Sequence, residues 1–225
     1  MDMMEIRRRV IQGASDLPPG YQRVKCIVDT NGRAYIDLLR KFNSTHRYKF
    51  DLQFLGNSHD LAAFGARDQS TYYPKNSSLT WVSDYKPIFY CGRNLPASMR
   101  GYTMTSLANT IQEFQSFEIK AYDGTFIITN SEGRHINIPG QTIETGYEYE
   151  TDEDMHFMSI NTPGTSIWGC MCKARLYEEY DANDKLISRF IPCIRRLDNV
   201  AGMYDVIENV FYNSANPSVP FTAEQ

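Results

Sequence analysis

The feature that most restricts the fold of this chain is the strict alternation of residues 47–54, Arg-Tyr-Lys-Phe-Asp-Leu-Gln-Phe. Every second side chain is large and apolar, and those between are charged or carry an amide. Successive side chains of a strand point to opposite faces of a sheet, so this period of two predicts a strand with one buried face. A second layer must cover that face.

Similar segments follow one another around turn residues. Residues 117–122 run into Asp123-Gly124, a pair favoured in two-residue hairpin turns, and then into residues 125–129. A second turn, at residues 130–133, precedes residues 134–138. We therefore expect three antiparallel strands in succession here.

Near the end of the chain, residues 171–180 and 186–193 flank the turn residues Asp181-Ala182-Asn183-Asp184 and predict one more hairpin. Further apolar or alternating runs occur at residues 24–28, 34–39, 61–66, 79–82, 88–91 and 156–160. About ten or eleven short strands with polar turns are typical of two packed antiparallel sheets.

Composition agrees with an all-β domain and narrows its partners. Aromatic residues make up 13% of the 225 residues, and aromatic side chains suit pleated surfaces. A net charge of −4 offers no broad cationic field for nucleic acid. No run reaches the roughly 20 apolar residues of a membrane span. The opening residues lack the apolar core of a signal peptide, so we expect no membrane insertion and folding in the cytoplasm where the chain is made.

Two segments interrupt the pattern of short strands. Residues 1–16 are charged in their first half and end in Gly13-Ala14-Ser15-Asp16, so we expect an extended arm ahead of a domain at residues 17–225. Residues 95–114 are expected to form an insertion, as a short helix or a long loop, at one end of the sandwich.

The five cysteines predict reduced thiols, because their odd number and irregular spacing do not form a disulfide framework. They are Cys26, Cys91, Cys170, Cys172 and Cys193. Cys170 and Cys172 would share one face of a strand, and with Cys193 on a neighbouring strand they suggest a zinc site. No fourth ligand is evident, so we expect core packing, with neither metal nor cofactor.

The segment from Leu17-Pro18-Pro19-Gly20-Tyr21 to Ile27, followed by Gly32-Arg33-Ala34-Tyr35-Ile36-Asp37, resembles the opening of phage and prophage laminin-G-like proteins. It departs from their pattern at Asp29-Thr30-Asn31. The resemblance spans about residues 17–221.

The closing run is the specific part of this resemblance. It consists of Cys172-Lys173-Ala174-Arg175-Leu176-Tyr177, Leu186-Ile187-Ser188-Arg189-Phe190-Ile191-Pro192-Cys193, Gly202-Met203-Tyr204-Asp205 and Phe211-Tyr212-Asn213-Ser214. The resemblance implies a concanavalin/laminin-G-like jelly-roll sandwich of two antiparallel sheets. It also implies a place on the virion, as a head fibre, capsid decoration or tail receptor-binding protein.

Such a sandwich can bind host surface carbohydrate, because aromatic faces stack on the apolar side of sugar rings. The candidate ligand-binding residues are Trp81, Tyr72, Tyr73, Tyr85 and Tyr90. For about half of these five residues, we expect packing in the core instead of ligand binding. We expect Trp168 in the core.

The acidic run at residues 148–154 comes closest to a catalytic motif. Sandwich glycosidases place two carboxylates on one strand in the order Glu-x-Asp-x-Glu. Here Glu148, Glu150 and Asp152 have the right spacing, but Asp154 stands where the pattern needs another glutamate. An exposed acidic turn is the preferred interpretation, with calcium binding as the alternative. His46, His59, His135 and His156 show no metal-ligand or triad spacing, so no catalytic residue is expected.

The leading hypothesis is therefore a non-enzymatic virion protein. Its arm would dock on other virion proteins through Ile6, Arg7, Arg8, Arg9, Val10 and Ile11, the arginines pairing with carboxylates. Alternatively, Val10 and Ile11 would add an edge strand to the chain's own sandwich. A homo-oligomer is expected, and trimers are common among phage fibres. The competing hypotheses are a glycan-degrading enzyme of the same fold and a bacterial surface adhesin.

Overall fold

The computed structural model describes residues 17–55, 61–67, 76–82, 86–92, 101–103, 113–135, 146, 148–162 and 168–225. Within these ranges the chain is built of β-strands, and a 3-10 turn at Ala121–Asp123 is the one helical element. No helix in the described part is long and apolar enough to cross a membrane. The fold is an all-β sandwich of two sheets, as the alternation predicts.

The larger sheet has ten strands. Its main path runs in the order β10 (Thr125–Thr129), β9 (Gln115–Lys120), β4 (Arg47–Phe54), β14 (Cys172–Tyr180), β15 (Leu186–Arg195), β16 (Val200–Asp205) and β17 (Val210–Tyr212). Off this path, β1 (Tyr21–Arg23) pairs with β15, and β2 (Cys26–Asp29) pairs with β14 and β18 (Thr222–Glu224). All of these pairs are antiparallel.

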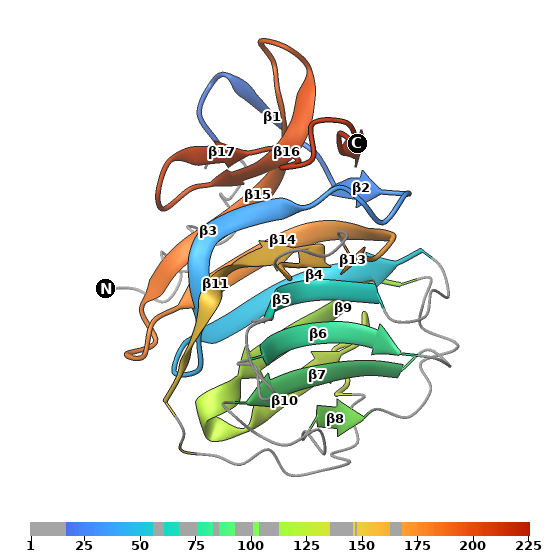
Figure 1. The fold of residues 1–225 in the computed structure, drawn as a ribbon. Coiled ribbons are helices and arrows are strands. Elements are labelled where there is room, and N and C mark those ends of the chain that lie inside the picture. Colours follow the sequence, from blue (N-terminus) through green and yellow to red (C-terminus); the bar gives the residue numbers. More distant parts are fainter. Residues whose placement is uncertain are drawn as a thin grey trace.

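The second sheet has eight strands. They are β12 (Ser159–Ile160), β13 (Trp168–Gly169), β5 (Leu61–Arg67), β6 (Asn76–Val82), β7 (Lys86–Gly92) and β8 (Gly101–Thr103), with β11 (Glu150–Phe157) between β5 and β3 (Ile36–Asn43). The single contact of β13 with β5 is parallel, and the other strand pairs are antiparallel. In Figure 1, strands β5, β6 and β7 form a layer in front of β4 and β9, and β1, β16 and β17 form a lobe above them.

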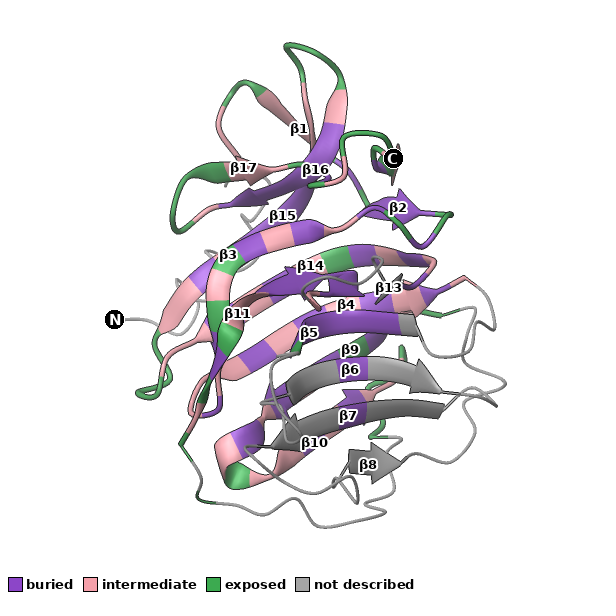
Figure 2. Cartoon of the chain, in the orientation of Figure 1, coloured by how far each residue is buried: buried purple, intermediate pink, exposed green. Residues whose placement is uncertain are grey.

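An aromatic core joins the two sheets. The ring of Phe50 on β4 lies 5.0 Å from that of Phe64 on β5 and 5.8 Å from that of Phe157 on β11, between ring centroids. In β4 the buried side chains alternate with partly exposed ones throughout the strand, as expected for a half-buried strand. Figure 2 shows this alternation along β4 and the continuous burial of β5.

Two of the three predicted hairpins form, but one turn differs from the expectation. In the third, Thr129 and His135 make an antiparallel bridge, and residues 136–138 of the expected strand lie outside the described residues. β9 and β10 are joined by the 3-10 turn at Ala121–Asp123 and by Gly124, whose φ is +71°. The connection is therefore longer than a two-residue turn, because Ala121 packs into the core instead of ending the strand. The turn at residues 181–184 follows the prediction, since Asp181 Oδ1 accepts hydrogen bonds from the main-chain N–H groups of Asn183 and Lys185.

The structure corrects the expected number of strands, since eighteen are present among the described residues rather than ten or eleven. The additional ones are mostly two or three residues long, too short for alternation to be recognised. One of them, β8, lies within the expected insertion at residues 95–114, which is therefore not simply a helix or a loop. It pairs with β7 at the edge of the second sheet.

Candidate functional site

Two of the five expected glycan-binding aromatics belong to strands of the second sheet. Trp81 lies in β6 and Tyr90 in β7, which are adjacent strands. Their side chains, and Tyr72, Tyr73 and Tyr85 altogether, lie outside the described residues. Binding of carbohydrate by these residues stays a prediction.

The docking arm also lies outside the described residues, so the role of Ile6, Arg7, Arg8, Arg9, Val10 and Ile11 stays a prediction. The described chain begins at Leu17. Tyr21 N donates a hydrogen bond to Pro18 O at 3.0 Å, and β1 follows at once. The domain boundary that the sequence suggests thus lies four residues before the first strand.

From Glu150 onward the acidic run belongs to β11 rather than to a turn, which corrects that expectation. Glu148, Glu150 and Asp152 are exposed, whereas Thr151 between them is buried. Thr151 Oγ1 accepts a hydrogen bond from Phe42 N at 3.0 Å, which ties the acidic segment to β3. Among the described residues no three His, Cys, Asp or Glu side chains gather as a metal site would require.

Four of the five cysteines pack in the interior as thiols, and the side chain of Cys91 lies outside the described residues. Cys26, Cys170, Cys172 and Cys193 are free and buried. Burial raises the pKa of Cys193 to about 12 and that of Cys26 to about 11, so both stay protonated at neutral pH. Cys193 pairs with β1 and β16, whereas Cys172 pairs with β2 and β4. Cys172 on β14 and Cys193 on β15 lie on neighbouring strands, as the sequence suggests, and both pack in the core.

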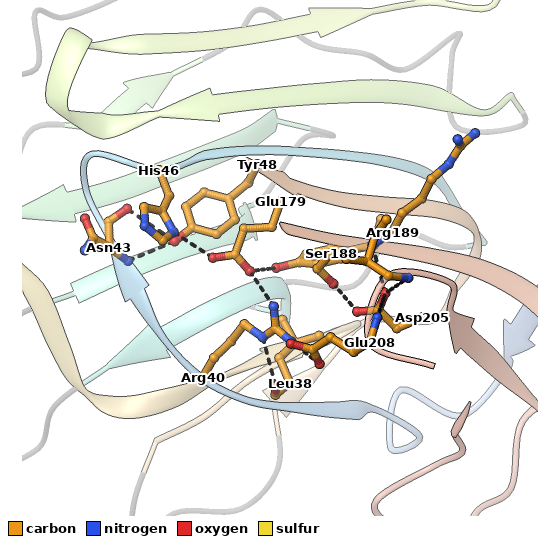
Figure 3. A network of polar contacts seen from close by, with 12 residues as sticks. Leu38, Arg40, Asn43, His46, Tyr48, Glu179, Ser188, Arg189, Asp205 and Glu208 are labelled. Carbon is orange, nitrogen blue, oxygen red and sulfur yellow. Dashed lines mark hydrogen bonds and ion pairs between the residues drawn. The ribbon is translucent and has the colours of Figure 1, made fainter. Parts of the chain in front are cut away.

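A buried polar network is the most distinctive side-chain arrangement of the described structure (Figure 3). Its centre is Glu179 on β14, which is only 1% exposed. His46 Nδ1 lies 2.8 Å from Glu179 Oε1, and Arg40 Nη1 lies 3.3 Å from Oε2. Tyr177 OH donates to the same Oε2 at 3.3 Å. The carboxylate therefore connects β14 to Arg40 and His46, which lie more than 130 positions earlier in the sequence.

A β-bulge explains how a glutamate comes to be buried here. The register between β14 and β4 shifts between Ala174 and Leu176, so that Arg175 is the additional residue. Before the bulge Ala174 faces the core; after it Tyr177 and Glu179 do. Uninterrupted alternation would instead have turned Glu179 outward. The sequence signal is the adjacent apolar pair Leu176-Tyr177, which breaks the period of two.

Arg40 extends the network to the C-terminal lobe. Its Nη2 lies 2.7 Å from Glu208 Oε2, in the turn between β16 and β17, and its Nε donates to Leu38 O at 3.3 Å. Burial acts to lower the pKa of Arg40, but neighbouring Tyr177 and the carboxylates of Glu179 and Glu208 outweigh it and raise that pKa. The guanidinium therefore stays charged and links the sandwich to the lobe.

The two buried tyrosines of the network are neutral donors. Burial raises the pKa of Tyr48 and of Tyr177 well above the ordinary value, and the charge of Glu179 adds to this effect. Tyr48 OH donates to Asn43 O at 3.2 Å and accepts from Asn43 N at 2.8 Å. These contacts secure the turn between β3 and β4.

Asp205, at the end of β16, organises the next turn. Its Oδ2 accepts a hydrogen bond from Ser188 Oγ at 2.5 Å, and its Oδ1 accepts from the main-chain N–H groups of Ile207 at 2.8 Å and Arg189 at 3.2 Å. Arg189 contributes its main chain while its guanidinium points away from the network (Figure 3). This carboxylate holds the β16–β17 turn, including Glu208, against β15.

His156 forms a separate buried site between β11 and β3. Its ring stacks on Tyr35 at 4.3 Å between centroids, and its Nδ1 lies 3.2 Å from Ser159 Oγ. Burial lowers the pKa of His156 to about 4, although Asp37 and Asp154 act in the opposite direction. The imidazole is therefore neutral at pH 7. Ser159 is fully buried, so the contact between His156 and Ser159 stabilises the interior of the fold.

The low pKa of His156 predicts acid sensitivity. The unfolded chain takes up this proton near pH 6.5 and the folded chain near pH 4. The free energy of unfolding should therefore fall as the pH drops through this window, by about 3 kcal/mol in total. Denaturant unfolding at pH 7, 6 and 5 measures the slope, and His156→Gln should reduce it. The exposed His135→Gln is the matched control, and equal slopes in all three proteins would contradict the assignment.

Comparison with models of protein families and with curated proteins found no match to this chain.

Proposed function

We propose that this chain is a non-catalytic structural and attachment protein of a bacteriophage particle, with a jelly-roll sandwich that binds neighbouring virion proteins or host surface glycan. The observation that carries the proposal is the use of the buried carboxylates. Glu179 joins β14 to β3 and to the turn between β3 and β4, and Asp205 holds the β16–β17 turn. Both carboxylates stabilise the fold, and a stable fold is what a structural protein requires.

The residues of the phage-like closing run support the same proposal. They form β14, β15, β16 and β17, and many of them are buried, among them Tyr177, Phe190, Cys193 and Asp205. The resemblance thus lies in residues that build the central sheet and the C-terminal lobe. It supports a shared scaffold, and the phage role is inferred from that scaffold.

The glycan-degrading alternative rests on the exposed carboxylates of β11. Incubating the protein with the capsular polysaccharide of the host tests it. Release of oligosaccharides by the wild-type protein, lost in Glu150→Ala or Asp152→Ala, would support the enzyme and overturn the non-catalytic proposal. Binding without release is the expected result.

The docking role of the arm predicts that a chain shortened to begin at Leu17 keeps its stability but no longer joins the particle. The reason is that β1 starts at Tyr21 and its preceding turn needs only Pro18. Thermal unfolding and mass spectrometry of purified particles measure the two properties. The full-length variant with Arg7, Arg8 and Arg9 changed to alanine should behave in the same way.

Two results would contradict this role. A fall in melting temperature of about 5 °C or more for the shortened chain would make the arm an integral strand. Absence of the full-length protein from purified particles would overturn the virion assignment itself.

A further inference from the structure

The outer face of the ten-stranded sheet carries a row of charges of alternating sign, one on each of four adjacent strands. In the strand register, Glu118 on β9 lies opposite Lys49 on β4. Lys49 in turn lies opposite Glu178 on β14, and Glu178 lies opposite Arg189 on β15. We call these four residues the charge row. At the usual strand spacing it is about 14 Å long.

Within one molecule the row consists of two ion pairs. Lys49 Nζ lies 2.9 Å from Glu118 Oε2, and Arg189 Nε lies 3.3 Å from Glu178 Oε1. Three of the four side chains remain accessible, with 34% of Lys49, 30% of Glu118 and 42% of Arg189 exposed, whereas Glu178 is 14% exposed. The pairs are preformed, so a partner covering this face would bury ion pairs that are already ordered rather than isolated charges.

The order of the signs makes the row complementary to itself. Read from β9 to β15 it is negative, positive, negative, positive; read in reverse it is positive, negative, positive, negative. A twofold axis parallel to the strands, between β4 and β14, would therefore place Glu118 opposite the second copy's arginine and Lys49 opposite its Glu178. Each position then meets the opposite charge.

The neighbouring row fits the same axis. Arg47 and Tyr180 are paired across β4 and β14, on either side of that axis, and within one molecule the guanidinium lies 3.9 Å from the ring centroid. After the twofold rotation Arg47 would meet the tyrosine of the second copy. Contact between a guanidinium and an aromatic ring is favourable across an interface as well as within a chain.

The size of the face suits a weak dimer. Strands β9, β4, β14 and β15, which lie symmetrically about that axis, form over the eight residues of β4 an area of about 19 Å by about 27 Å. Covering it on two copies would bury roughly 1,000 Å², at the lower limit of specific interfaces. We propose that this face binds a second copy of the chain in a twofold, face-to-face dimer held by the charge row. The inference does not depend on the proposed phage role.

A complete charge reversal tests the proposal. The variant Glu118→Lys, Lys49→Glu, Glu178→Lys, Arg189→Glu keeps both ion pairs of the row and is again self-complementary. It loses the 3.7 Å contact of Glu118 with Arg47 and the hydrogen bond from Tyr180 OH to Glu178. It should form homodimers, as the wild type should. In a mixed dimer, however, like charges would face each other at all four positions. Wild type and variant, carrying different fluorescent labels, should therefore give at least about tenfold less mixed than homotypic dimer.

Sedimentation velocity of the full chain measures the dimer, and energy transfer between the two fluorescent labels measures mixed dimers. Both are measured at low salt and in about 1 M NaCl, where screening should dissociate the dimer. The control reverses the exposed pair Glu132 and Arg134, 3.4 Å apart in the turn after β10, and should mix freely with the wild type. Circular dichroism confirms that each variant is folded. A monomeric wild type at all concentrations, or free mixing of the reversed variant, would overturn the proposal.

Discussion

Replacing Glu179 with alanine is expected to lower the free energy of unfolding by about 4 kcal/mol, because one partner of a buried ion pair is removed and the other remains. Arg40 would keep Glu208 but lose its interior partner. His46 and the hydroxyl of Tyr177 would lose their contacts with the same carboxylate. Denaturant unfolding of the full chain, followed by circular dichroism, measures the loss.

Two further variants separate charge from shape. Glu179→Gln keeps the volume and a hydrogen-bond acceptor, so the expected loss is smaller, about 2 kcal/mol. Glu132→Ala removes an exposed carboxylate whose ion pair with Arg134 contributes little to stability, so its unfolding should be unchanged. If Glu179→Ala unfolds like Glu132→Ala, the network does not stabilise the fold.

Replacing Gly202 with alanine is expected to destabilise the protein by about 3 kcal/mol through overpacking. Gly202 lies in β16, between β15 and β17. An added Cβ would lie 2.8 Å from the ring of Phe211 and closer still to the carbonyl oxygen of Tyr212. The carbonyl belongs to the main chain of β17, so the strand itself would have to move.

The matched control is Gly20→Ala, because nothing lies within 4 Å of an added Cβ at that position. Its thermal unfolding should resemble that of the wild type, whereas Gly202→Ala should melt at least about 5 °C lower. Near-ultraviolet circular dichroism would show whether the environment of Tyr21, Tyr204 and Phe211 is disturbed, since the Tyr21 ring lies 4.7 Å from Tyr204 and 5.3 Å from Phe211. Equal melting temperatures would contradict the predicted clash.

Local patterns in the sequence predicted much of the fold. The alternation of residues 47–54 identified β4, and turn residues at 181–184 identified the β14–β15 hairpin. Alternation and turn preference act over a few neighbouring residues, and so they can be recognised without knowing the partner strand. The same logic fails for strands of two or three residues, such as β8 or β17, where too few positions exist for a period.

The candidate sites depended on tertiary structure. Glu179 is buried because a bulge at Arg175 changes which residues of β14 face the core, and because Arg40 and His46 reach it from segments more than 130 positions away in the sequence. The charge row likewise exists only because the registers of β9, β4, β14 and β15 bring alternate signs together. Strand register between distant segments is determined by the packing of the whole core, and no local stretch of the sequence contains it.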